Sequence, residues 1–311
     1  MDHIYAVGVG GANIDLCGRS YAPIEPCDSN PGEIEISAGG VTRNICDNLA
    51  RLGADVKLVS AVGDDLFAQI ICEQSAQAGI DVSHIYHTPG RSSSMYLAIL
   101  DNSGDMHVAL SDMHVLQNLP LDYLGRKREL IANAAVVVTD PCMKAERFEC
   151  VLSYCRPGQI VCVDPVSTAY ARALIPYIGQ IHTVKPNRLE LEILAGQPVD
   201  TDARLESACE TLLNRGVQRV FVSLGAEGCF YMDDTGAVLR RKLRPAKMVN
   251  ASGAGDSFAA AMLYATLQGY DAEKTLDYGM AAGIAAVTHE QTINPNMSVP
   301  LLESILQTYR L

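Results

Sequence analysis

Hydrophobic positions along this chain alternate between two spacings from one end to the other. Continuous apolar runs, typical of strands buried on both faces, occur at residues 4–9, 56–62, 135–138, 160–164 and 219–224. Between them, apolar residues recur every three or four positions, as on one face of a helix. The clearest helical run begins after Gly40, ends at Gly53, and has its apolar residues at Val41, Ile45, Leu49 and Leu52.

A second helical run covers residues 66–78, and nearly everything from residue 254 onward is helical except a break at 292–298. No repeat and no linker interrupts the series. Alternating strands and helices predict an α/β fold with a mostly parallel central sheet flanked by helices. We expect one domain over residues 1–311.

Two stretches break this alternation. Residues 16–37 contain three prolines and many turn formers, with strand-like pieces such as 33–36. Residues 92–110 predict a hairpin of strands 94–100 and 106–110 joined by the turn 101–104. Both stretches stand where strands of the main sheet have ended. We therefore expect a small β-sheet lid, formed by about 12–38 and 92–112.

Charge and composition limit the partners. The chain has 36 acidic and 24 basic residues and a formal net charge of −12, which argues against nucleic acid or an anionic membrane as a partner. No apolar run reaches the roughly 18 residues of a membrane span, and the N-terminus reads as a strand rather than a signal peptide. The ten cysteines are scattered without a Cys-x-x-Cys pair, as expected of reduced thiols. A cytoplasmic protein with a small-molecule substrate fits these properties.

The strongest chemical motif is Gly253-Ala-Gly-Asp256, which opens a helical run. Glycines there let successive N–H groups point into one concavity at a helix N-terminus, which suits a phosphate group. Asp256 in the first turn would lie beside a transferring phosphoryl group, where it can take a proton from an attacking hydroxyl. The alternative is an ordinary helix start with Asp256 near the cap, and the spacing alone does not decide between them.

Two further segments suit ATP. Ser223, Gly225 and Gly228 follow a strand, and the glycines allow a ligand to approach the backbone closely; the alternative is a plain turn. Asn187 and Glu190 begin a helix after Lys185 and share one face, where they can orient a magnesium-bound water; the alternative is a helix cap.

Other phosphate motifs are missing. The chain has no Gly-x-x-x-x-Gly-Lys-Ser/Thr P-loop. The segment from Gly8 to Asn13 lacks the third glycine of a dinucleotide fingerprint and opens no helix. Neither a P-loop nor a Rossmann site is expected.

Three motifs in the same order resemble those of the ribokinase-like (PfkB) kinase family: Gly39-Gly40 with Asn44, Asn187-x-x-Glu190, and Gly253-Ala-Gly-Asp256. The resemblance covers the whole chain and implies a ribokinase-like fold of about nine strands, with ATP and Mg²⁺ as cofactors. It implies a catalytic group of Asp256 with an anion hole at Gly253, Ala254 and Gly255. It also implies a substrate site at Asn13, Asp15, Gly39, Gly40, Asn44 and Asp112. The implied ATP site comprises Lys185, Asn187, Ser223, Gly225, Gly228, Ser252 and Gly253, with Glu190 and Asn187 in the outer shell of Mg²⁺.

Within that family, several segments are similar to pseudouridine kinases: 12–15, 28–32, 100–106, 111–113, 164–167, 181–188 and 292–295. The resemblance implies transfer of phosphate to the 5′-hydroxyl of pseudouridine. Alternatives are a kinase for another nucleoside or a free sugar, such as adenosine or ribose, and a catalytically silent ligand-binding relative. Asn250 stands where many members have an Asp that helps to hold a monovalent cation, so a K⁺ site there stays open. Exposed edges of the lid strands favour a homodimer formed through the lid.

Overall fold

The computed structural model describes residues 4–244 and 246–309. A ten-stranded sheet runs through its centre in the order β14-β13-β12-β11-β10-β9-β1-β4-β5, with β6 beside β4. Its strands are β1 (Ala6–Val9), β4 (Val56–Val62), β5 (Ile80–Asp81), β6 (Ile85–His87), β9 (Val136–Thr139), β10 (Ile160–Val163), β11 (Thr183–Val184), β12 (Arg219–Ser223), β13 (Cys229–Asp233) and β14 (Val238–Arg241). All pairings from β5 to β12 are parallel, and only the two pairings of β13, with β12 and with β14, are antiparallel.

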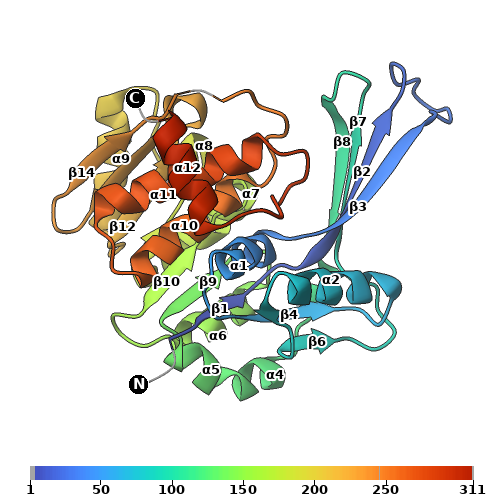
Figure 1. The fold of residues 1–311 in the computed structure, drawn as a ribbon. Coiled ribbons are helices and arrows are strands. Elements are labelled where there is room, and N and C mark those ends of the chain that lie inside the picture. Colours follow the sequence, from blue (N-terminus) through green and yellow to red (C-terminus); the bar gives the residue numbers. More distant parts are fainter. Residues whose placement is uncertain (1–3, 245, 310–311) are drawn as a thin grey trace.

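Helices cover both faces of this sheet (Figure 1). One face carries α1 (Val41–Arg51), α2 (Leu66–Gln77), α10 (Ala254–Leu267) and α11 (Ala272–Val287), with α12 (Val299–Tyr309) packed outside α11. The other carries α4 (Leu121–Arg126), α5 (Arg128–Asn133), α6 (Ala145–Tyr154), α7 (Thr168–Leu174), α8 (Arg188–Ala195) and α9 (Asp202–Leu213), while α3 (His114–Gln117) follows the second sheet. No helix in the described ranges is long and apolar enough to cross a membrane.

The apolar runs become strands because both of their faces are buried. In β9, Val137 contacts the core under α4–α9, whereas Val136 and Val138 contact the core under α1 and α10. The predicted strand 56–62 is confirmed residue for residue, and the helices after Gly40 and residue 65 also lie where expected. The largest boundary error is at the first strand, which begins at Ala6 and leaves Ile4 outside it, 67% exposed. The strands predicted at 135–138, 160–164 and 219–224 differ by one residue at one or both ends.

A separate four-stranded sheet stands away from the central one, as Figure 1 shows. Its order is β3-β2-β7-β8, from β2 (Asn13–Ser20), β3 (Gly32–Gly39), β7 (Met95–Leu100) and β8 (Met106–Asp112). The predicted hairpin and its turn at 101–104 are confirmed, but β2 and β3 are regular eight-residue strands rather than the short pieces expected. We call this sheet the lid sheet.

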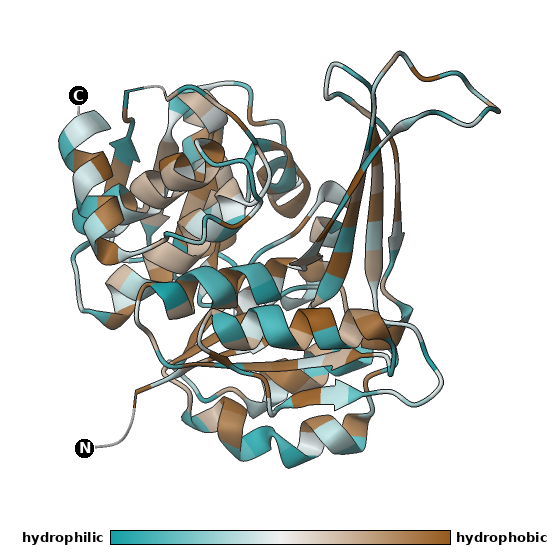
Figure 2. Ribbon diagram, turned by 45° about the vertical axis from the view of Figure 1, so that its right-hand side comes forward, coloured by the Kyte–Doolittle hydropathy of each residue, from teal (hydrophilic) through white to brown (hydrophobic). Residues whose placement is uncertain are grey.

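The two faces of the lid sheet differ in polarity. Asp15 pairs with Ser37 and Tyr96, and Tyr96 pairs with Ser111, so one polar row crosses the sheet. The neighbouring row points to the opposite face, because side chains alternate along a strand. That face is aliphatic and carries Leu16, Ile34, Ile36, Leu97, Ile99, Val108 and Leu110. In Figure 2, hydrophobic segments, coloured brown, recur along the strands of this sheet.

Candidate active site

Charged and polar residues follow four neighbouring parallel strands at the point where each ends. Asp140 follows β9, Asp164 follows β10, Lys185 follows β11, and Ser223 closes β12. Carboxyl ends of parallel strands share one edge of a sheet, which is where α/β folds place ligands. The first three are at most 6% exposed, so this edge holds buried charge that needs partners.

The N-terminus of α10 lies at this edge and has the geometry of an anion hole. Gly253 precedes the helix with φ = 74°, and a Cβ on it would lie 2.0 Å from the carbonyl oxygen of Thr292. Only glycine fits there. The N–H groups of Ala254 and Gly255 in the first turn have no side chain capping them, and the Lys185 ammonium lies 3.4 Å from where a Cβ of Gly255 would be. Free N–H donors beside a cation suit a phosphate group.

Asp256 occupies the first turn of α10, as predicted, and its Oδ2 accepts a hydrogen bond of 2.9 Å from Nδ2 of Asn44. Burial and the negative charges of Asp164 and Asp15 raise its pKa to about 7, against the opposing effect of Asn44 and Lys185. The side chain still keeps part of its surface in contact with solvent. A carboxylate that is half ionised near neutral pH and can be reached by a ligand is suited to general-base work.

Lys185 is paired with Asp164 at 3.1 Å, and both side chains are nearly inaccessible. Burial alone would lower the pKa of Lys185, but Asp164, Glu190 and Asp256 outweigh it and the pKa is raised. The ammonium is therefore charged at neutral pH. It supplies the positive charge that the backbone of the anion hole lacks.

Asp15 begins the lid sheet next to this edge. Its Oδ1 accepts a hydrogen bond of 2.7 Å from Nδ2 of Asn13, which is itself 2% exposed. A Cβ on Gly39 would lie 2.2 Å from Oδ2 of Asp15, so Gly39 leaves room for the carboxylate, while Gly40 caps α1. Burial raises the pKa of Asp15, and the bond from Asn13 and the charge of Arg43 oppose the rise. Asn13 thus holds Asp15 in place.

Asn187 and Glu190 form a capping box at the start of α8. Glu190 N–H donates to Oδ1 of Asn187 at 2.9 Å, and Asn187 N–H donates to Oε2 of Glu190 at 2.8 Å. No group of three or more His, Cys, Asp or Glu in the described part of the chain can hold a metal ion. With these ligands engaged in a cap, a magnesium ion would depend chiefly on phosphate oxygens and water, as Mg²⁺ commonly does.

The remaining predicted residues fall at two places. Ser223 pairs with Asn187 in an isolated bridge, and the tight turn with Gly225 and Gly228 follows it. Asn250 lies before the anion hole, where its Oδ1 accepts from Ser252 N–H at 2.9 Å and its Nδ2 donates to the Glu290 carbonyl at 2.8 Å. Both ends of this carboxamide are therefore engaged.

Asp112 is not brought to the other predicted residues. It pairs with Met95 at the end of β8, in the row that lies on the aliphatic face, and bonds to His114. Ser111, one residue earlier, shares the row of Asp15 instead. The substrate role expected for Asp112 has no geometric support.

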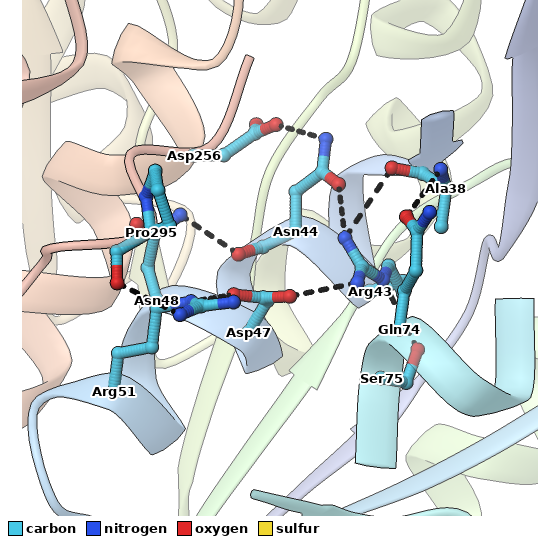
Figure 3. Close-up of polar contacts among 10 residues, drawn as sticks. All are labelled: Ala38, Arg43, Asn44, Asp47, Asn48, Arg51, Gln74, Ser75, Asp256 and Pro295. Atoms are coloured by element: carbon cyan, nitrogen blue, oxygen red, sulfur yellow. Dashed lines mark hydrogen bonds and ion pairs between the residues drawn. The ribbon is translucent and has the colours of Figure 1, made fainter. Parts of the chain in front are cut away.

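Three residues of the site were not predicted as site residues from the sequence. Asp140 and Asp164 stand at the carboxyl ends of predicted buried strands, a signal that was present in the pattern. Arg43 had no such signal: it lies within α1 on the side opposite the apolar stripe, where an arginine is ordinarily solvated, yet it is 3% exposed. Figure 3 shows Arg43 between Asn44 and the end of β3.

Comparisons with known proteins all indicate the same family of kinases. The model of the pfkB family of carbohydrate kinases matches residues 4–299. A pseudouridine kinase of Escherichia coli K12 is 34% identical over 97% of this chain and 96% of its own length. A sugar kinase of uncharacterised activity from the same strain, YeiI, is 35% identical over 94% of this chain and 81% of its own.

A solved structure of a candidate sugar kinase from Clostridium perfringens superimposes with a TM-score of 0.88 at 34% identity, covering 99% of this chain and 97% of the other. The ten-stranded core with its separate small sheet is therefore a ribokinase-like fold. The three motifs all lie within residues 4–299, the range that the family model matches. This chain belongs to the pfkB family of carbohydrate kinases, which transfer phosphate to an alcohol group.

Proposed function

We propose that the protein phosphorylates the 5′-hydroxyl of pseudouridine with ATP, giving pseudouridine 5′-phosphate and ADP. The observation that carries the chemistry is Asp256, a carboxylate with a pKa of about 7 placed in the first turn of α10 beside the anion hole. Asp256 takes the proton of the attacking hydroxyl. The N–H groups at residues 253–255 and the Lys185 ammonium stabilise charge on the transferring phosphoryl oxygens.

The substrate would lie between the ligand edge and the polar row of the lid sheet. Asp15 and Asn44 would bind ribose hydroxyls. Asp15 has its carboxylate close enough to Asp256 to raise the pKa of that residue, and Asn44 has its carboxamide nitrogen on Asp256. Oxygens of ATP and water would be the main ligands of Mg²⁺, with Asn187 and Glu190 orienting the water, and the ion would neutralise phosphate charge. Asn250 brings no charge to a cation beside the anion hole, and its amide already donates to Glu290, so the proposed reaction includes no potassium ion.

Support for pseudouridine comes from the relative of that name, which aligns over nearly the whole of both chains, and from the lid segments. A second candidate, a kinase for a sugar or another nucleoside, is favoured by the equally similar YeiI. A catalytically silent relative is disfavoured, because such a protein has no need of a general base at the anion hole. ATP consumption with and without acceptors separates it from both kinases.

The substrate is tested with a panel of pseudouridine, uridine, adenosine, ribose and fructose. We expect pseudouridine to give the highest kcat/KM, with uridine well below it, measured as ADP formed and product identified by mass. If ribose, fructose or adenosine exceeded pseudouridine by about tenfold or more, roughly 1.4 kcal/mol of transition-state preference, the substrate assignment would be wrong. The family assignment would stand.

We also propose that the protein is a homodimer formed through the aliphatic face of the lid sheet. On this face Ile34 is 73%, Leu110 67% and Ile36 49% exposed. A thin sheet with one bare aliphatic face needs a cover to be stable. A second copy of the chain supplies one of matching chemistry.

Assembly is tested by placing a charge on that face. Leu110→Glu should convert dimer to monomer in sedimentation equilibrium, because a carboxylate cannot be buried without a partner. Ala109→Glu, on the polar side of the same strand, is the matched control and should leave the mass unchanged. A wild-type chain that sediments as a monomer at every concentration contradicts the proposal.

A further inference from the structure

Arg43 lies in the first turn of α1 and is buried, which is unusual for an arginine. It is 3% exposed, and its guanidinium makes four contacts to four different residues. Nε donates to Ser75 Oγ of α2 at 3.1 Å, and Nη2 pairs with Asp47 at 2.7 Å. Nη1 donates to the Ala38 carbonyl of β3 at 3.3 Å and to Asn44 Oδ1 at 3.4 Å (Figure 3).

The contact with Asn44 determines which way its carboxamide points. Oδ1 accepts from Arg43, so Nδ2 is directed to Oδ2 of Asp256, 2.9 Å away. In the reversed orientation, the NH₂ group would meet the guanidinium donor and Oδ1 would meet the carboxylate. Both contacts would be repulsive. Without Arg43, no donor would hold Oδ1 of Asn44, and the carboxamide could turn its nitrogen away from Asp256.

We infer that Arg43 is a positioning residue for the reaction: through Asn44 it keeps a hydrogen-bond donor on Asp256, and through Ala38 it ties that donor to the root of the lid sheet. The inference rests on Asp256 being the base of the proposed reaction. A donor on the carboxylate favours its ionised form, the form that accepts a proton. Arg43 thereby keeps a larger share of Asp256 ready at neutral pH.

Other charges also act on Asp256, and the test must separate them. Asp164 and Asp15 raise its pKa, and Lys185 lowers it. None of these three contacts Arg43 by a hydrogen bond, although the charge of Arg43 does act on Asp15. Arg43→Lys is therefore the most informative variant, because it keeps the charge and removes the planar fork that holds Ala38, Ser75 and Asn44 together.

The readout is the pH dependence of kcat/KM, which reports groups of the free enzyme. Arg43→Lys should move the acid limb to higher pH by about 0.5–1 pH unit, the value expected for one lost hydrogen bond to a carboxylate. The rate should recover above the new midpoint. Arg51→Gln is the matched control: Arg51 pairs with the same Asp47 at 2.5 Å but does not contact Asn44, and its acid limb should not move.

A double variant distinguishes positioning from loss of packing. Asn44→Ala alone should also raise the acid limb, and adding Arg43→Lys to it should produce no further shift, because the route through Asn44 is already gone. A shift that persists in the Asn44→Ala background, or an Arg43→Lys enzyme that loses thermal stability while its acid limb stays in place, overturns the inference.

Two measurements keep the test decisive. If Arg43→Lys does not fold, Ser75→Ala leaves Arg43 in place but frees Nε, and a smaller shift in the same direction is expected; no shift overturns the inference. If no panel compound is phosphorylated, the proposed function fails. The ¹³C-detected titration of the Asp256 carboxyl then still reports whether Arg43→Lys raises its pKa.

Discussion

Asp256→Asn should lower kcat by about 10²–10⁴-fold, the usual contribution of a positioned general base. Asparagine keeps the size of the side chain and can still bond to Asn44, but it cannot accept the proton. Nucleoside and ATP binding should change little, so KM stays near that of the wild type. Steady-state kinetics at saturating Mg·ATP measures this, and a variant with more than a tenth of the wild-type kcat removes Asp256 from the mechanism.

The same variant gives a pH signature. Wild-type kcat/KM should fall as pH drops through about 7, the pKa of Asp256, and the variant's residual rate should lack this limb. Folding stability should depend on pH in the opposite direction to kcat/KM. The pKa of this carboxyl is 3.8 in the unfolded chain and about 7 in the folded chain. The free energy of unfolding of the wild type therefore falls as pH rises from about 4 to 7. The Asn variant does not have this ionisable group. Its melting temperature should therefore exceed that of the wild type above pH 7, and this difference should shrink below pH 4.

Lys185→Met should destabilise the protein by about 3–5 kcal/mol, because it leaves Asp164 buried without its counter-ion. Both side chains of this pair are at most 8% exposed. Urea unfolding at pH 7.5 measures the loss. Lys185→Arg, which keeps the charge, should lose less. A change below about 1 kcal/mol for Lys185→Met, typical of a solvated surface pair, would contradict the buried pairing.

Removing both partners separates stability from catalysis. The double variant Lys185→Met/Asp164→Leu should regain most of the lost stability, because two apolar residues can replace a buried pair with little loss. Its kcat should remain low, since the cation beside Gly255 is gone. Recovery of activity together with stability would show that Lys185 has no part in phosphoryl transfer.

The core elements were predictable because they depend on local patterns. Strands such as β4 are buried on both faces and read as unbroken apolar runs, and the glycines of the anion hole mark a helix start. β2 and β3 were partly missed because the prolines lie in the connection between them, at residues 23, 26 and 31, whereas the strands themselves extend from that loop to the central sheet.

The polar contacts of α1 could not be predicted from any pattern in the sequence. Its apolar stripe predicts one buried side, but five polar residues outside the stripe are buried as well: Thr42, Arg43, Asn44, Asp47 and Asn48. Their partners include residues of β3, α2 and α10 and Asp140 after β9, which are far apart in the sequence. Such contacts exist only after the chain has folded. The role of Asn44 could therefore be assigned by resemblance, and that of Arg43 could not.

Side chains of the lid strands alternate between the two faces of the sheet, so the strands should not tolerate insertions or deletions of single residues. In β2, Asp15 lies in the polar row of the lid sheet, and the next residue, Leu16, belongs to the aliphatic face. Inserting or deleting one residue before Asp15 exchanges every side chain of the strand between the two faces. Aliphatic groups would then lie on the face of the proposed substrate site, and a carboxylate would enter the proposed subunit contact. Insertions should be accepted in the loop at 21–31 and rejected within β2.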